Sequence, residues 1–199
     1  AQAQGDRPPA ARPLGRVDFP PYQERTLENG LRVFAIEHDE QPVISIQLVV
    51  AAGSANDPAQ LPGLATFTTE LLMSGTETRT AQEIAGLIDF AGGAISTRAA
   101  REAIIVSASV LADSTELAFD LLRDVVLNPA YSPGEIERLR QQTASSMSAN
   151  LQDPDFIADT IFNAVLYQDH PYGHPEDGTP SSVQRIQRED IAEFHDTYF

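Results

Sequence analysis

Apolar and polar residues along this chain follow a strand-like pattern first and a helix-like pattern later. Between residues 25 and 36, two β-prone runs flank Glu28-Asn29-Gly30, and an Asn-Gly pair in that setting predicts a hairpin. Residues 43–51 (VISIQLVVA) begin with alternation and end as a continuous apolar run, which predicts a strand buried largely on both faces. Two further strands are expected, near residues 94–97 and 103–110.

Helical spacing dominates after residue 60. A first helix is expected over residues 62–73, with Pro62 in its first turn and an apolar stripe formed by Leu64, Phe67, Leu71 and Leu72. Thr80 and Glu83 fit a capping box for a second helix that ends near Phe90. Later helices are expected at residues 113–127, 133–151, 154–167 and 188–199. This order predicts an α+β fold, with helices packed on a largely antiparallel sheet.

Composition narrows the possible functions. The net charge is −16, and all 13 basic residues are arginine, which argues against nucleic acid as a partner because its phosphates need a basic surface. No apolar run reaches the roughly 18 residues that a membrane span requires. Cysteine is absent, so disulfides, thiolate nucleophiles and cysteine metal sites are excluded.

The first residues favour an exported protein. Residues 1–21 are rich in proline, arginine and alanine and predict an extended lead-in before an ordered domain at 22–199. The opening Ala1-Gln2-Ala3-Gln4 is typical of a mature end left by signal-peptide removal, and an arbitrary boundary is the alternative. We therefore expect a periplasmic or secreted location.

The segment 63–76, GLATFTTELLMSGT, resembles the zinc-binding helix of the pitrilysin/insulinase family (M16) of metallopeptidases. That family carries an inverted motif, His-x-x-Glu-His, within a Gly-Leu-Ala-His-Phe-x-Glu-His-Met-Leu-Phe-x-Gly-Thr frame. Histidines at i and i+4 share one helix face and can hold one zinc ion, while the Glu beside the second histidine can take a proton from metal-bound water.

The resemblance implies that this chain has lost that chemistry. Thr66 and Glu70 stand at the two histidine positions, and Thr69 stands at the position of the catalytic Glu. Threonine is a poor zinc ligand and cannot act as a base near neutral pH. The family's third ligand, a Glu from a later helix, is also missing, since the candidate positions hold Ala144, Ser145, Ser146 and Met147. We expect no catalytic residue and no metal ligand in this chain.

The resemblance extends over roughly residues 22–199. The further segments that carry it are the Asn-Gly hairpin, 51–58 (AAGSANDP), 91–93 (AGG), 167–173 (YQDHPYG) and 178–179 (GT). The resemblance implies a LuxS/metallopeptidase-like (M16) domain. Family members usually continue with a further strand and a second homologous domain, so this domain is expected to be incomplete. His170 and His174 lie in one of these family loops with Pro171 and Gly173 between them, which argues against a metal pair on one helical face.

The strand after the glycine turn is the better candidate for function. In the family it can accept a peptide as an added strand, which implies a possible substrate-binding edge at Ile95, Ser96, Thr97 and Arg98. Such binding uses backbone hydrogen bonds and needs no zinc. The alternative is an ordinary sheet strand.

The leading hypothesis is a non-catalytic M16-like subunit or domain that helps to form a peptide-binding chamber. Its expected partner is a homologous zinc-bearing M16 subunit, a C-terminal M16 domain, or both, as in heterodimeric members of the family. Peptides or unfolded polypeptides are the expected ligands, and zinc is expected only in the active partner. Two alternatives stay open, a zinc metalloendopeptidase with an atypical site and a purely structural subunit like those of respiratory complexes.

Overall fold

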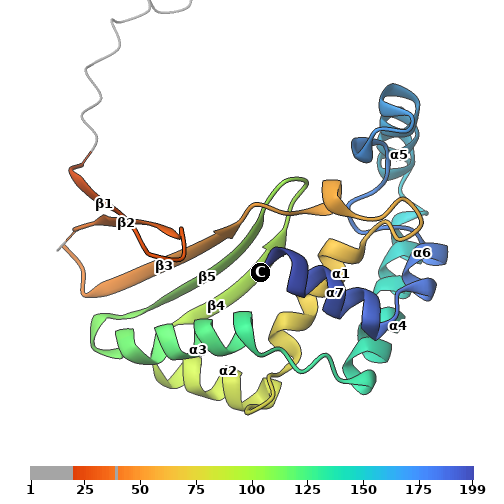
Figure 1. The fold of residues 1–199 in the computed structure, drawn as a ribbon. Helices are drawn as coiled ribbons and strands as arrows, with labels where there is room; N and C mark the ends of the chain where they lie inside the picture. Colours follow the sequence, from red (N-terminus) through yellow and green to blue (C-terminus); the bar gives the residue numbers. More distant parts are fainter. Residues whose placement is uncertain (1–19, 39) are drawn as a thin grey trace, which may run out of the picture. The chain divides into compact units, whose positions relative to one another are not determined.

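The computed structural model describes residues 20–38 and 40–199 and is shown in Figure 1. The chain divides into two units, one up to residue 41 and one from residue 42 to residue 199, and each is described by itself. The extended lead-in expected over residues 1–21 lies, apart from its last two residues, outside the described part.

The first unit contains a β-hairpin. Strands β1 (Tyr22–Thr26) and β2 (Arg32–Ile36) pair antiparallel, with Thr26 opposite Arg32. Gly30 has a φ of +86°, a conformation that glycine adopts without steric cost and that the turn requires. The predicted Asn-Gly hairpin is therefore confirmed.

The second unit is built on a three-stranded antiparallel sheet. Its strands are β3 (Val43–Val50), β4 (Ala94–Ala99) and β5 (Ile104–Leu111), in the order β3-β5-β4. The prediction that residues 43–51 are buried on both faces was wrong, because β3 alternates between half-buried and exposed positions and Val49 is 55% exposed. Exposure of the side chains alternates along this apolar run, because helices of this unit cover only one face of the sheet (Figure 1).

Seven α-helices complete this unit: α1 (Leu64–Leu71), α2 (Ala81–Phe90), α3 (Thr115–Leu127), α4 (Pro133–Asn150), α5 (Pro154–Tyr167), α6 (Pro180–Arg185) and α7 (Arg188–Tyr198). Short 3-10 turns lie at Ser54–Asn56, Leu72–Ser74, Ala112–Ser114 and Pro171–Gly173. The predicted capping box of α2 is confirmed, since Glu83 N donates to Thr80 Oγ1 and Thr80 N donates to the Glu83 carboxylate. Helix α1 begins two residues later than predicted, because Gly63 at its N-cap has a φ of +93°.

The main core lies where α1 meets its neighbours. Helix α1 contacts β4, α4 and α7, and α4 contacts α6. The predicted apolar stripe is confirmed, since Leu64, Phe67 and Leu71 of α1 and Leu72 of the following 3-10 turn are all nearly inaccessible. The structure is thus the α+β arrangement that the sequence predicts, with antiparallel strands and helices packed on them.

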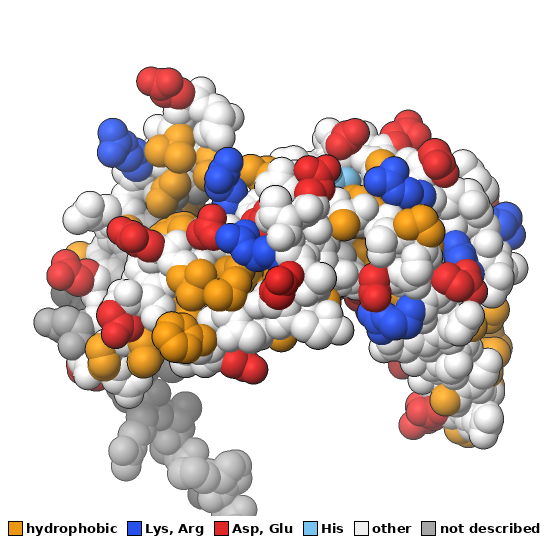
Figure 2. Space-filling model, turned by 90° about the horizontal axis from the view of Figure 1, so that it is seen from below, with side chains coloured by type: hydrophobic (Ala, Val, Ile, Leu, Met, Phe, Trp, Pro, Cys, Tyr) orange, Lys and Arg blue, Asp and Glu red, His pale blue; other side chains and the backbone are white. Residues whose placement is uncertain are grey.

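The outer surface mixes acidic and apolar side chains. Figure 2 shows red carboxylates and orange apolar groups interspersed on one face. Helix α5 has no buried residue, and Phe162 and Val165 are 63% and 70% exposed. Within residues 20–38 and 40–199, no helix combines the length and the apolar character needed to cross a membrane.

Candidate functional site

Helix α1 is held in place through its N-terminus. The Asp57 carboxylate accepts hydrogen bonds from the backbone N–H groups of Gly63 and Ala65, at 2.7 and 2.8 Å. These bonds satisfy donors that have no partner within the helix. Burial raises the pKa of Asp57 to about 7, and the backbone donors oppose that rise. Asp57 therefore fixes where α1 begins and which way its faces point.

A second contact places the loop after α5 beside the start of α1. A Cβ atom at Gly178 would lie 2.2 Å from the Pro62 carbonyl oxygen, and one at Gly63 would lie 2.6 Å from that of Asp177. Both glycines also have positive φ angles, +80° and +93°. Only glycine permits this close approach of two backbones, and the approach brings Asp177 next to α1.

Strand β4 is tied to the same helix. The Thr97 hydroxyl donates to the Thr69 carbonyl oxygen at 3.1 Å. Thr69 itself is 1% exposed, and its hydroxyl donates back to the Ala65 carbonyl oxygen at 2.7 Å. The strand that carries Ile95–Arg98 thus contacts α1 near the C-terminal end of that helix, and it is one of the two end strands of the three-stranded sheet.

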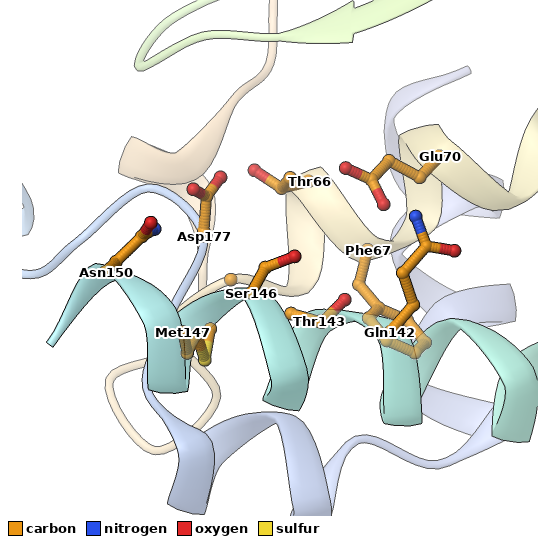
Figure 3. A pocket seen from close by; sticks show the side chains of 10 residues that line it. Thr66, Phe67, Glu70, Gln142, Thr143, Ser146, Met147, Asn150 and Asp177 are labelled. Atoms are coloured by element: carbon orange, nitrogen blue, oxygen red, sulfur yellow. The ribbon is translucent and has the colours of Figure 1, made fainter. Parts of the chain in front are cut away.

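A cavity of about 200 Å³ lies between α1 and α4 (Figure 3). Thr66 and Glu70 enter it from α1, one helical turn apart, and the loop after α5 contributes Asp177. Figure 3 shows the Glu70 carboxylate turned toward the side chains of α4. The remaining lining residues are Gly63, Phe67, Gln142, Thr143, Ser146, Met147 and Asn150.

The charged side chains that line this cavity, Glu70 and Asp177, are both acidic. Burial raises the pKa of Glu70, and the negative charge of Asp177 raises it further. Thr66 does not offset these charges, since its hydroxyl donates to the Glu176 carbonyl oxygen at 2.9 Å. Among the ten lining residues there is no arginine, lysine or histidine.

The donor atoms in this cavity do not suit zinc. Zinc in proteins is held by histidine, cysteine and carboxylate ligands, usually three or four of them. Here two carboxylates, Glu70 and Asp177, stand among hydroxyl and amide groups. Within the described part of the chain, no group of three or more His, Cys, Asp or Glu residues could hold a metal ion.

The residues singled out from the sequence fall into three groups. Thr66 and Glu70 line the cavity, whereas Thr69 is buried and does not line it. Of the four candidate positions for the third ligand, only Ser146 and Met147 line the cavity. His174 borders a second cavity, of about 310 Å³, which does not include His170.

Four lining residues had not been anticipated. Thr143 and Asn150 share a face of α4 with Ser146, so helical spacing from Ser146 would have found them. Gln142 lies one turn before Ser146 and follows the same rule. Asp177 could not be found this way, since only the folding of a distant loop brings it to α1.

Comparisons with known proteins point to one family. Residues 33–179 match the family model described as Insulinase (Peptidase family M16). An uncharacterised zinc protease of Mycobacterium leprae is 36% identical over 170 residues, which cover 85% of this chain and 38% of that protein. A probable mitochondrial-processing peptidase subunit beta of Schizosaccharomyces pombe is 25% identical over 191 residues, covering 94% of this chain and 41% of that protein. The chain thus spans about two fifths of the length of such relatives.

Solved structures share the fold. The crystal structure of a peptidase M16 inactive domain from Pseudomonas fluorescens superposes with a TM-score of 0.84 at 27% identity, covering 88% of this chain and 43% of that one. A protease from Helicobacter pylori gives the same TM-score at 21% identity, covering 90% of this chain and 44% of that one, a likeness of fold alone.

Proposed function

This chain belongs to the insulinase family, peptidase family M16, and we propose that it is a non-catalytic member that helps a zinc-bearing M16 partner to form a peptide-binding chamber. The partner is a homologous subunit, a second M16 domain, or both. Because the chain spans about two fifths of the length of its relatives, the activity of the whole protein is part of this proposal.

One observation carries the proposal, namely the side chains at the cavity between α1 and α4. Helix α1 keeps its buried stripe and its anchoring by Asp57, so the frame that would hold a metal site is present. The cavity face of α1 offers Thr66 and Glu70, where the resemblance places two histidines. Among the four candidate positions for the third ligand, α4 offers Ser146 and Met147 at the cavity, and neither is a glutamate. Zinc and hydrolysis are therefore assigned to the partner. The inactive M16 domain of Pseudomonas fluorescens supports such a role, since it shares the fold.

Peptide binding can persist without zinc. Strand β4 ends the sheet of the second unit, and the backbone of an end strand can pair with an extended peptide. Ser96 and Arg98 are exposed on this strand, while Ile95 and Thr97 are half-buried against the rest of the unit. We propose this edge as the surface that holds the peptide, and a periplasmic or secreted location for the assembly.

The experiment compares cleavage by three preparations, which are this chain alone, its co-purifying M16 homologue alone, and the two together. Internally quenched peptides report the rate. The proposal expects no cleavage by this chain, weak cleavage by the homologue, and a clear gain for the pair that o-phenanthroline abolishes. Metal-dependent cleavage by this chain alone would instead favour an atypical catalytic site. A pair no faster than the homologue alone, with no peptide bound to this chain, would favour a purely structural role.

A further inference from the structure

Helix α5 turns its apolar face away from the unit to which it belongs. Its half-buried residues, Phe156, Thr160 and Asn163, recur at the spacing of one helical face, and they line the second cavity. At about 100° per residue, Val165 lies on the opposite side of the helix from Phe156. Val165 is 70% exposed, so the solvent side is the apolar one. A surface helix of a globular domain normally has the reverse arrangement.

The exposed apolar face of α5 is large enough to be a contact surface. We call it the α5 patch, and its members lie on neighbouring turns, namely Ile157, Ile161, Phe162, Val165 and Leu166. Side chains of this size together expose roughly several hundred Å², the range in which the largest apolar patch of a monomer is often functional. Figure 1 shows α5 extending away from the sheet, and the helix contacts chiefly the turn at Pro171–Gly173. The fold of this unit therefore leaves the patch uncovered.

The charged side chains beside the α5 patch are acidic. Asp159 lies one turn before Phe162, and Asp155 lies one turn before Asp159, and both carboxylates are exposed. No arginine or lysine occurs from residue 141 to residue 184, a stretch that contains the whole of α5. The patch thus has an apolar centre and an acidic rim. A surface that complements it is apolar at its centre and basic at its rim.

This charge distribution selects among the possible occupants of the α5 patch. A second copy of the chain, docked through the same patch, would set acidic side chains against acidic side chains. An anionic lipid surface attracts helices that carry lysine or arginine on their polar side, whereas α5 carries neither and the chain has a net charge of −16. A protein surface with a basic rim avoids both conflicts.

We propose that the α5 patch docks the zinc-bearing M16 partner, through a surface of that partner that is apolar at its centre and basic at its rim. This inference rests on the proposed function, because that function supplies the partner. It adds which surface of this chain makes the contact and what chemistry the partner must present there.

The test measures the affinity of this chain for its co-purifying M16 homologue by fluorescence anisotropy, with one of the two proteins labelled. The double substitution Ile161→Ser with Val165→Ser should weaken binding more than tenfold, because apolar residues at the centre of an interface carry most of its affinity. The matched control, Phe119→Ser with Leu127→Ser, changes two residues of α3 that are each 54% exposed, and it should leave the affinity unchanged. Circular dichroism and urea unfolding check that each variant is folded.

A second pair of variants tests the acidic rim. Asp159→Arg places a cation where the partner is basic, and it should weaken binding severalfold. Glu116→Arg makes the same change at an exposed position on α3 and should have little effect. Added salt should weaken binding by the natural chain, because it screens the attraction between the two rims.

The possible failures are distinct. Equal binding by the natural chain and the Ile161→Ser, Val165→Ser variant would overturn the α5 patch as the docking surface and leave the proposed pair intact. Stronger binding by Asp159→Arg would overturn the basic rim. Light scattering and sedimentation with phosphatidylglycerol vesicles test the other occupants. A dimer of this chain, or vesicle binding, that the double variant abolishes would overturn the proposal. No affinity between the natural chain and the homologue would overturn the proposed function together with this inference.

Discussion

The two faces of helix α1 differ in what they keep of the family pattern. Its buried face carries Leu64, Phe67 and Leu71, all at most 2% exposed, and these pack as a core helix of the fold requires. Its cavity face carries Thr66 and Glu70, which do not form a zinc ligand pair. Packing determines the residues of the buried face, whereas the proposed loss of the zinc site concerns only the cavity face.

Restoring ligands on the cavity face gives the largest expected effect. We predict that Thr66→His, Glu70→His and Ser146→Glu together create a site that binds zinc, with an apparent free energy that approaches the roughly 10 kcal/mol of structural sites. The three positions already line one cavity, so little rearrangement is needed. Metal analysis after dialysis should find about one zinc per chain.

A matched variant checks the geometry of that restored site. It carries the same two histidines but places the glutamate at Ser148, which is exposed on α4 and outside the cavity. Strong zinc binding by this control, or none by the restored variant, would contradict the placement of α4 opposite α1.

The next largest expected effect is the difference in free energy of unfolding between substitutions on the two faces of α1. Leu71→Ala removes a side chain that is 1% exposed and should lower the free energy of unfolding by about 2–5 kcal/mol. Glu70→Gln, one residue away, should change it by no more than about 0.5 kcal/mol, the usual range for a site with no partner to lose. Urea unfolding followed by circular dichroism compares the two. Similar losses would mean that the cavity face is also structural.

Removing the Asp57 carboxylate that anchors α1 should lower the free energy of unfolding by less than removing a core side chain of this helix. Asp57→Ala leaves the N–H groups of Gly63 and Ala65 without their acceptor and should cost about 1–3 kcal/mol. Asp57→Asn keeps one acceptor oxygen and should cost less, by the same urea measurement. If alanine proves no worse than asparagine, these two bonds do not hold the helix.

Much of the fold follows from local pattern, as the hairpin at Gly30 and the capping box at Thr80 show. Those features depend on a few consecutive residues and a fixed backbone geometry. The face of β3 was mispredicted because an apolar run does not reveal which face helices will cover. In the site, helical spacing is enough to predict that Thr66, Glu70 and Ser146 line a common cavity. Asp177 could not be predicted in this way, because it reaches α1 through the contact of Gly178 with Pro62.

The central claim is that this member of the family has the frame of a zinc site without its ligands. The most direct test measures zinc in the natural chain, purified without chelator and dialysed against zinc-buffered solution, beside its co-purifying homologue. We predict far less than one zinc per molecule of this chain and about one per molecule of the homologue. One tightly held zinc in this chain, lost when Glu70 is changed to glutamine, would contradict it.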